Sequence, residues 1–183
     1  WQLDTVDYVF DLHDGVLVEV ALPFGEHENV TGFLIRKLSA RFENFDLPYF
    51  IAPKVLVKPA LKDSGFFTDV LVLDKRYLTN EPLYASTNRQ DDYALKFDEY
   101  SDIGIPEYWI VDYLGLGGKE FIGSPKEPTF TMCELVNGQY VRKSQKSGLI
   151  QSKAFPELNL TVEQIFDAAA FWDTTIELIY WQQ

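Results

Sequence analysis

The stretch that decides the fold is residues 69–112, which read DVLVLDKRYLTNEPLYASTNRQDDYALKFDEYSDIGIPEYWIVD. An apolar strand begins on Asp69, a helix with one inward-looking lysine, Lys96, follows, and a second strand covers Tyr108–Asp112. That second strand is nearly all apolar, which is typical of a strand buried on both faces. A carboxylate at the edge of a core strand, with a lysine brought toward it by a helix, suits a divalent metal ion and a polarised water.

Length and composition predict one compact domain. The 183 residues leave no room for a second sizeable core, and 46% of them are hydrophobic. No apolar run approaches the roughly 20 residues that span a bilayer, and no signal peptide is visible, so we expect a soluble protein. Cys133 is the only cysteine, which excludes an internal disulfide and favours a reducing cytoplasm. Because the chain starts on Trp1 and not on Met, its true start is expected upstream.

The net charge of −12 argues against tight, unassisted binding to nucleic acid, because an acidic surface repels phosphates. It does not exclude a nuclease. Such an enzyme needs carboxylates to hold metal ions, and a local stripe of Lys and Arg is enough to contact the substrate.

Hydrophobic periodicity around the central stretch predicts alternating strands and helices. Asn137-Gly138 is the strongest short hairpin signal, and Thr161 with Gln164 forms a capping box for a helix that ends near Ala170. A helix over about 92–103 is expected to end at Gly104. The other predicted elements are strands over Val16–Leu22, Tyr49–Lys58 (broken at Pro53), Phe66–Asp74, Thr129–Val136 and Tyr140–Lys143, and a helix over His27–Phe45. The pattern predicts an α/β chain with a mixed sheet.

The same stretch resembles the Uma2 family, also called DUF820, whose fold is that of the PD-(D/E)XK restriction-endonuclease-like nucleases. The matching residues are Asp69-Val70, Asp92-Tyr93 with Lys96, Glu99-Tyr100, and the long run Gly104–Asp112. The resemblance implies a single Uma2-like domain over residues 1–183, with a restriction-endonuclease-like core in which a mixed β-sheet is flanked by helices.

One element that the resemblance implies is missing. Family members carry a further apolar strand, with the second acidic metal ligand, between the Asp-containing strand and the lysine helix. Residues 75–91 contain no apolar run long enough for a core strand, and the segments on either side of Tyr84-Ala85 look like the two flanks of that strand. Either the protein has lost the strand, or the sequence omits a segment near residues 84–85. We favour the omission, because losing a central strand would destroy the sheet.

The resemblance assigns a metal ion, Mg²⁺ or Mn²⁺, to Asp69. Hard divalent cations take oxygen ligands, and one such carboxylate anchors the ion. On sequence alone, a strand-end Asp that satisfies turn amides is the commoner arrangement. Lys96 takes the place of the motif lysine, which would orient the attacking water and stabilise the transition state. An i,i+4 surface pair with Asp92 explains Lys96 equally well. The family's usual Pro before the Asp is Thr68 here.

Two further carboxylates are candidates. Asp11 stands where the family has a Glu that reaches the metal site, and Val16 replaces a second family Glu. A turn or capping role is the alternative for Asp11. Glu81 is the only nearby residue that could replace the missing acidic ligand, although a surface loop position is the simpler explanation. His27 matches the family's habitual His before the first long helix, and we expect its ring to hydrogen-bond to backbone. With two His in the chain, a His-based zinc site is not expected.

Two functions follow from these observations. The first is a metal-dependent endonuclease that hydrolyses DNA, with Asp69, Lys96 and Asp11 as catalytic residues and Asp69 and Glu81 as metal ligands. The second is a non-catalytic, homo-oligomeric or partner-binding module on the same fold. The apolar tail, Phe171–Gln183, predicts a homodimer, because a chain end rarely exposes so much apolar surface.

Overall fold

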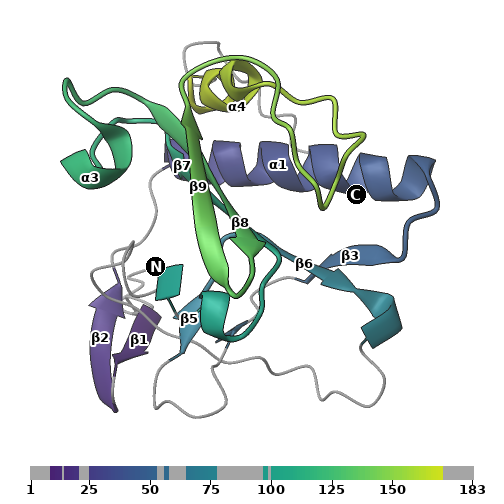
Figure 1. Cartoon of the computed structure of the whole chain (residues 1–183), viewed down its shortest axis with the longest axis horizontal. Helices are drawn as coiled ribbons and strands as arrows, with labels where there is room; N and C mark the ends of the chain where they lie inside the picture. Colours follow the sequence, from purple (N-terminus) through teal and green to yellow (C-terminus); the bar gives the residue numbers. More distant parts are fainter. Residues whose placement is uncertain are drawn as a thin grey trace, which may run out of the picture.

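The computed structural model describes residues 9–13, 15–20, 25–52, 56–57, 65–77, 97–98 and 100–170. Its described part contains both helices and strands, with the strands mostly in consecutive pairs or longer runs (Figure 1). They are β1 (Val9–His13), β2 (Val16–Val20), α1 (Gly25–Asn44), β3 (Tyr49–Ala52), β4 (Leu56–Val57), β5 (Phe66–Phe67), β6 (Leu71–Asp74), the 3₁₀ helix η1 (Lys75–Tyr77), β7 (Glu107–Asp112), α3 (Lys119–Ile122), β8 (Thr129–Val136), β9 (Gln139–Gln145) and α4 (Val162–Ala169). None of the described helices is long and apolar enough to cross a lipid bilayer.

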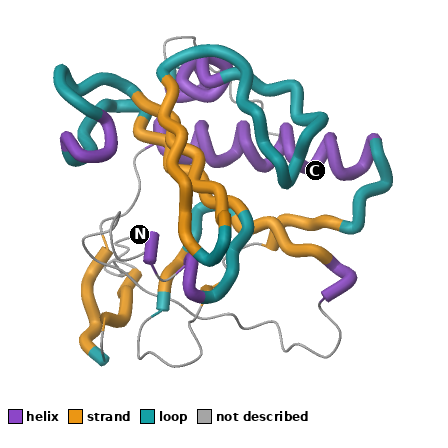
Figure 2. The backbone as a smooth tube through the Cα atoms, in the orientation of Figure 1, coloured by secondary structure: helices purple, strands orange, loops and turns teal. Residues whose placement is uncertain are grey.

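The strands form four small antiparallel sheets, ordered β1-β2, β3-β6, β4-β5 and β7-β8-β9. Helix α1 runs behind the β7-β8-β9 sheet, and α4 lies beside α1 (Figures 1 and 2). Helices therefore flank sheets, as the predicted fold class requires. Within the described residues, β6 is hydrogen bonded to β3 alone and β7 to β8 alone, and every strand pair is antiparallel.

The predicted strand over Phe66–Asp74 is divided into β5 and β6. The described parts of the predicted strand over Tyr49–Lys58 are β3 and β4, and the break predicted at Pro53 falls on residues 53–55, which lie outside the described residues. The β3-β6 and β4-β5 ladders keep one common register. Asp69 lies at the centre of the three-residue gap between β5 and β6, outside any strand.

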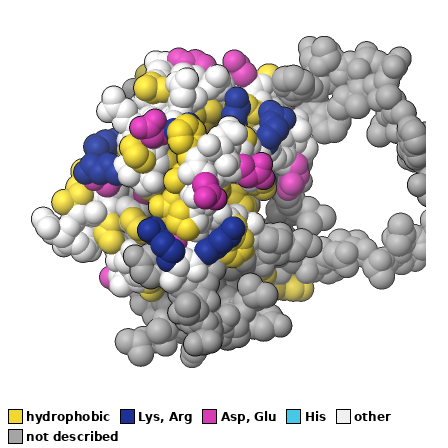
Figure 3. Space-filling view, turned by 90° about the vertical axis from the view of Figure 1, so that its right-hand side faces the viewer, with side chains coloured by type: hydrophobic (Ala, Val, Ile, Leu, Met, Phe, Trp, Pro, Cys, Tyr) yellow, Lys and Arg dark blue, Asp and Glu magenta, His cyan; other side chains and the backbone are white. Residues whose placement is uncertain are grey.

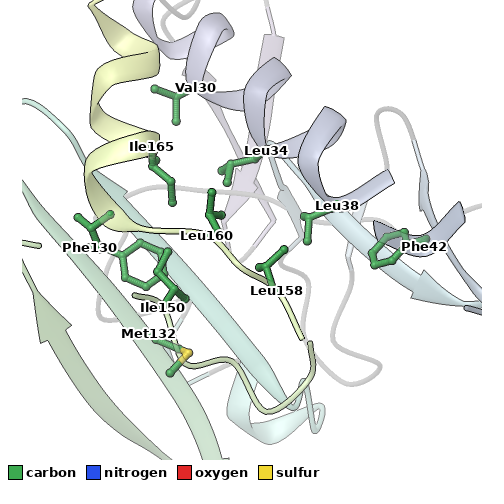
Figure 4. Close-up of a cluster of buried hydrophobic side chains, with 11 residues drawn as sticks. Val30, Leu34, Leu38, Phe42, Phe130, Met132, Ile150, Leu158, Leu160 and Ile165 are labelled. Carbon is green, nitrogen blue, oxygen red and sulfur yellow. The ribbon is translucent and has the colours of Figure 1, made fainter. Parts of the chain in front are cut away.

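The main core lies between α1, α4 and the β7-β8-β9 sheet (Figure 4). Helix α1 presents Val30, Leu34, Leu38 and Phe42 at helical spacing, as its sequence predicted. They face Phe130 and Met132 of β8 together with Ile150, Leu158, Leu160 and Ile165. Partly buried side chains next to this core include Val72 of β6 and Trp109 and Val111 of β7. Both sheets therefore rest on the same helix.

Strand β7 contacts a core on each face, which confirms the prediction from its apolar sequence. Trp109 and Val111 pack on the main core, whereas Ile110 belongs to a second cluster with Tyr100, Cys133 and Tyr140. Cys133 is fully buried in that cluster, and the burial raises the pKa of its thiol to about 11. Cys133 is thus a core thiol that behaves as a small apolar side chain.

Local turn and cap signals also match the structure. Asn137 and Gly138 have φ values of 53° and 79°, which is the two-residue hairpin geometry that Asn-Gly favours. The capping box of Thr161 and Gln164 is complete at the start of α4. The helical turn that contains residue 100 ends at Gly104. There Gly104 N–H donates to Ser101 O and Ile105 N–H donates to Tyr100 O, the two bonds of a Schellman motif.

Candidate functional site

Asp69, the carboxylate predicted to anchor a metal ion, lies in the bend between β5 and β6. The prediction placed it at the start of a strand, but β6 begins two residues later, at Leu71. Because the ladder is interrupted at Asp69, its side chain leaves the sheet, and it is 69% exposed. Asp69 does not line either of two hollows on the surface of the described part of the molecule. The larger, about 570 Å³, lies between the helical turn at residues 97–102 and the β8-β9 hairpin.

His27 is the group that meets Asp69. Its Nε2 lies 3.3 Å from Asp69 Oδ1, and its Nδ1 lies 3.7 Å from Glu28 Oε1, a distance too long for a hydrogen bond. Nδ1 is buried and has no hydrogen-bond partner among the described residues. The ring was predicted to hydrogen-bond to backbone, and this was wrong: in the described structure it contacts carboxylates.

The position of His27 follows from the sequence of α1. His27 precedes Val30 and Leu34 by three and seven residues, so it extends the buried stripe of the helix by one turn. The ring is consequently only 32% exposed. The same turn carries Glu26 and Glu28 near the positive end of the helix dipole, where acidic side chains are favoured, and Glu28 lies beside the ring.

The pKa of His27 is raised above its usual value. The main cause is the hydrogen bond that the ring donates to the Asp69 carboxylate, and the negative charges of Asp69 and Glu28 add to it. Partial burial lowers the pKa, but by less. The imidazolium form of His27 is therefore favoured beside Asp69.

Two more residues stand close to this site, and sequence reasoning assigned neither a role. Thr68, next to Asp69, has a buried hydroxyl that finds no hydrogen-bond partner within the described part of the chain. Tyr113 follows β7, and its pKa is raised first by burial and then by the negative charge of Glu26. The end of β7, the first turn of α1 and the β5-β6 bend therefore lie in one neighbourhood. The signal available for Thr68 was its replacement of the family's Pro.

The family model described as "Uma2: Putative restriction endonuclease" matches residues 2–163. The chain belongs to the Uma2 family. A solved structure from Anabaena variabilis ATCC 29413, described as "a putative nuclease belonging to DUF820", matches with a TM-score of 0.59 and 11% identity. The match covers 91% of this chain and 94% of the other chain. At this identity the likeness shows the fold alone, and the predicted restriction-endonuclease-like fold is confirmed. No curated protein matches the chain.

For the other site residues predicted in this Uma2 protein, the structure does not describe the side chains. Lys96 and Glu81 lie outside the described residues, as do the gap expected near residues 84–85 and the tail from Phe171. The backbone of Asp11 is in β1, opposite Val18 of β2, but its side chain is not described. Val16, which replaces a family Glu, is 62% exposed.

The described part of this Uma2 protein contains one candidate site contact, between His27 and Asp69. Across those residues there is no group of three or more His, Cys, Asp or Glu side chains that could hold a metal ion. The Asp69 carboxylate is an accessible hard oxygen ligand, the kind that Mg²⁺ takes, often one or two per site with waters completing the shell. In the kind of ligand atom, the Asp69 carboxylate would suit a magnesium ion, and it is the one predicted ligand whose side chain the structure describes.

Proposed function

We propose that this Uma2 protein is a metal-dependent endonuclease that hydrolyses phosphodiester bonds in DNA. The observation that carries the proposal is an exposed carboxylate, Asp69, held by His27 at a break in the sheet of a nuclease-family fold. An Asp that only closed a turn would need no charged partner from a distant helix. A carboxylate that binds a cation must stay accessible, and Asp69 does.

Mg²⁺ or Mn²⁺ is the proposed cofactor, and Asp69 is its proposed ligand, with Glu81 or an acid from the missing strand as the second. A bound divalent ion supplies a polarised water as nucleophile and neutralises charge on the phosphate. Lys96 would orient that water and donate hydrogen bonds to the developing negative charge. Asp11 would bring a further carboxylate from β1.

DNA is the proposed substrate, and the distribution of charge limits how it binds. On the face in Figure 3, Lys and Arg side chains are interspersed with Asp and Glu. Several described cations are already paired: Lys143 and Lys153 with Glu134, Lys146 with Glu127, and Arg41 with Glu157. We therefore propose weak binding to DNA, strengthened by a homodimer in which two sites address two strands. The proposed location is the reducing cytoplasm, where Cys133 stays a thiol.

The test is cleavage of supercoiled plasmid with Mg²⁺ or Mn²⁺, compared with EDTA. Wild-type protein should nick or linearise the plasmid only with the metal, and Asp69→Ala should lower the rate at least 100-fold, since a ligand is lost. Asp167→Ala, which removes an exposed carboxylate from α4, is the matched control and should keep full activity. Metal-dependent cleavage that survives in Asp69→Ala would contradict the assignment.

A second function is favoured by the charge balance. A net charge of −12 and neutralised surface cations suit a partner-binding module better than a DNA-binding surface. Such a module would keep the His27–Asp69 pair as a structural contact. It would show no metal-dependent cleavage, and Mn²⁺ would not raise its melting temperature.

A further inference from the structure

We propose that Lys143 of β9 and Lys153 of the loop after it contact phosphate groups of the DNA backbone. This inference rests on the proposed function, because it takes DNA as the partner of the chain. It names the surface by which a protein with a net charge of −12 binds a polyanion.

The first argument is the distribution of charge along the chain. Residues 135–156 contain four Lys and Arg residues and no Asp or Glu, although the whole chain has 28 acidic residues against 16 basic ones. This segment covers the end of β8, all of β9 and much of the loop that leads to α4. Its basic residues are all exposed, and they are Arg142, Lys143, Lys146 and Lys153. Basic residues gathered along one segment are the electrostatic signature of a surface that contacts nucleic acid.

The second argument is that two of these cations share one carboxylate. Lys143 Nζ lies 3.1 Å from Glu134 Oε2, and Lys153 Nζ pairs with Glu134 Oε1. Two positive charges on one negative charge leave a surplus of one. Hydrogen bonds donated by Lys153 and Lys143 hold the pKa of Glu134 below its usual value. The carboxylate therefore stays ionised and keeps both ammonium groups close together.

The depth of these groups decides which charge a ligand meets first. The Glu134 side chain is 9% exposed, whereas those of Lys143 and Lys153 are 56% and 73% exposed. A phosphate that approaches from solvent meets the two ammonium groups before it meets the carboxylate. An ammonium group has three N–H donors, so a contact with Glu134 leaves donors for phosphate oxygens.

The surface beside the two lysines has the shape and the side chains that a DNA backbone needs. Both lysines line a hollow of about 450 Å³, and the exposed amides of Gln151 and Asn159 line it too. Lysine, Gln and Asn side chains all commonly contact phosphate and sugar groups of DNA. Glu157 also lines the hollow, but its Oε2 is paired with Arg41 Nη2 at 3.2 Å.

The loop that carries Lys153 is anchored to the sheet. The backbone N–H groups of Lys153 and Ala154 donate to Glu107 Oε2 at 3.0 and 3.2 Å, and Trp109 Nε1 donates to Glu107 Oε1 at 2.6 Å. Glu107 lies opposite Glu134 in the β7-β8 ladder. One carboxylate thus holds the backbone of the loop, and its neighbour holds the lysine side chain. A contact that is already in place costs less entropy when a ligand binds.

The experiment measures binding of a short fluorescent DNA duplex to the full chain by anisotropy, at several NaCl concentrations and in EDTA so that no DNA is cut. Lys143→Gln and Lys153→Gln should each raise the Kd about 10-fold at low salt. Each should also lower the slope of log Kd against log salt concentration by about 1, because one phosphate contact is lost. Each variant leaves the other lysine on Glu134, so that carboxylate keeps a partner.

Lys119→Gln is the matched control. It removes the same charge from an exposed lysine of α3, which lies on the other side of β9 from the Lys153 loop (Figure 1). Its Kd and salt slope should match those of wild type. Equal losses in Lys119→Gln and in the two variants of the proposed surface would overturn the inference, because net charge alone would explain them.

A measurement on wild-type protein keeps the test independent of how a variant folds. Acetic anhydride modifies exposed lysine amines, and mass spectrometry locates each modified residue. Bound duplex should protect Lys143 and Lys153 and leave Lys119 modified as in the free protein. Equal modification of Lys143 and Lys153 with and without bound DNA would overturn the inference.

Two results separate this surface from the function on which it rests. If wild-type protein cuts plasmid with metal while Lys143→Gln and Lys153→Gln keep the wild-type Kd and salt slope, the surface is overturned and the nuclease stands. If duplex binding depends on both lysines but no metal supports cleavage, the nuclease fails and the surface stands.

Discussion

Residues 100–170 and the Asp69 site differ in how far their side chains are buried. The first is a three-stranded sheet and a helix around side chains with almost no exposure, such as Phe130, Leu160 and Ile165. The second is an exposed carboxylate in a break between two short strands, and its described contact is with the half-buried ring of His27. A continuous core fixes a scaffold, whereas a site that receives a ligand must stay accessible and is drawn from less stable parts of the molecule.

The largest effect expected from this comparison concerns the chain itself. If a strand is missing beside the site, the native protein from its source will not contain the join at Tyr84-Ala85. Trypsin cuts after Arg76 and Arg89, so the printed sequence requires the peptide YLTNEPLYASTNR. We expect mass spectrometry to find a longer product there and an intact mass above the 21.1 kDa of this sequence by more than terminal residues explain. Detection of that peptide as written would show that the sequence is continuous and would leave the second ligand unassigned.

Stability should depend on the core and hardly on the exposed N-terminal hairpin. Leu160 is fully buried, and Leu160→Ala should lower the free energy of unfolding by about 2–5 kcal/mol, because it loses apolar burial and leaves a cavity. Leu17 on β2 is 68% exposed, and the same change there should cost less than about 0.5 kcal/mol. Urea denaturation measures both. Equal losses would mean that the hairpin belongs to the core.

The β8-β9 turn should be sensitive to backbone strain alone. An added Cβ at Gly138 meets no atom within 4 Å, but φ is +79°, so Gly138→Ala should cost about 1–2 kcal/mol. Gly32 on α1 also has open space and needs no positive φ, so Gly32→Ala should instead stabilise by about 0.5–1 kcal/mol. Thermal denaturation measures both changes: the melting temperature should fall for Gly138→Ala and rise for Gly32→Ala. A neutral Gly138→Ala would show that the turn tolerates another geometry.

Next to the site, Thr68→Val tests whether the buried hydroxyl lowers the stability of the folded protein. The Oγ1 atom has no described partner, so replacing it with a methyl group of similar shape should stabilise the protein by about 1 kcal/mol. Chemical denaturation gives the difference. If stability falls, the hydroxyl has a partner, such as a water, and the site is better satisfied than the described contacts suggest.

The smallest effect is the pH dependence of the His27–Asp69 pair. Because folding raises the pKa of His27, the pair adds stability that is complete below pH 6.5 and is lost as pH rises through the folded pKa. Asp69 is largely exposed, so the contribution should be near the low end of about 0.2–1 kcal/mol. The stability difference between wild type and His27→Gln, without metal, should be larger at pH 5.5 than at pH 8. A difference that is constant with pH would rule out a charged pair.

The scaffold was predictable because its signals are local. Asn137-Gly138, the Thr161 capping box, Gly104 and the α1 stripe each specify a short segment by its own conformational preferences, and the structure contains all four. The apolar run of β7 predicted burial on two faces for the same reason.

The site was only half predictable. Asp69 was found through its resemblance to a family pattern, whereas the ring of His27 was predicted to hydrogen-bond to backbone, although its spacing ahead of Val30 and Leu34 is that of the buried face of α1. The contact between them joins residues 42 positions apart, and it depends on the break between β5 and β6, which no local rule locates. Contacts between residues far apart in the sequence are set by packing, so the contact of the His27 ring with a carboxylate was seen only in the folded structure.

A crystal structure of the full chain grown with Mn²⁺ shows whether Asp69 anchors a divalent ion. Anomalous scattering locates the ion without reference to activity. We predict a peak bonded to an Asp69 carboxylate oxygen at about 2.0–2.3 Å. A peak elsewhere, with Asp69 contacting His27 alone, would contradict it.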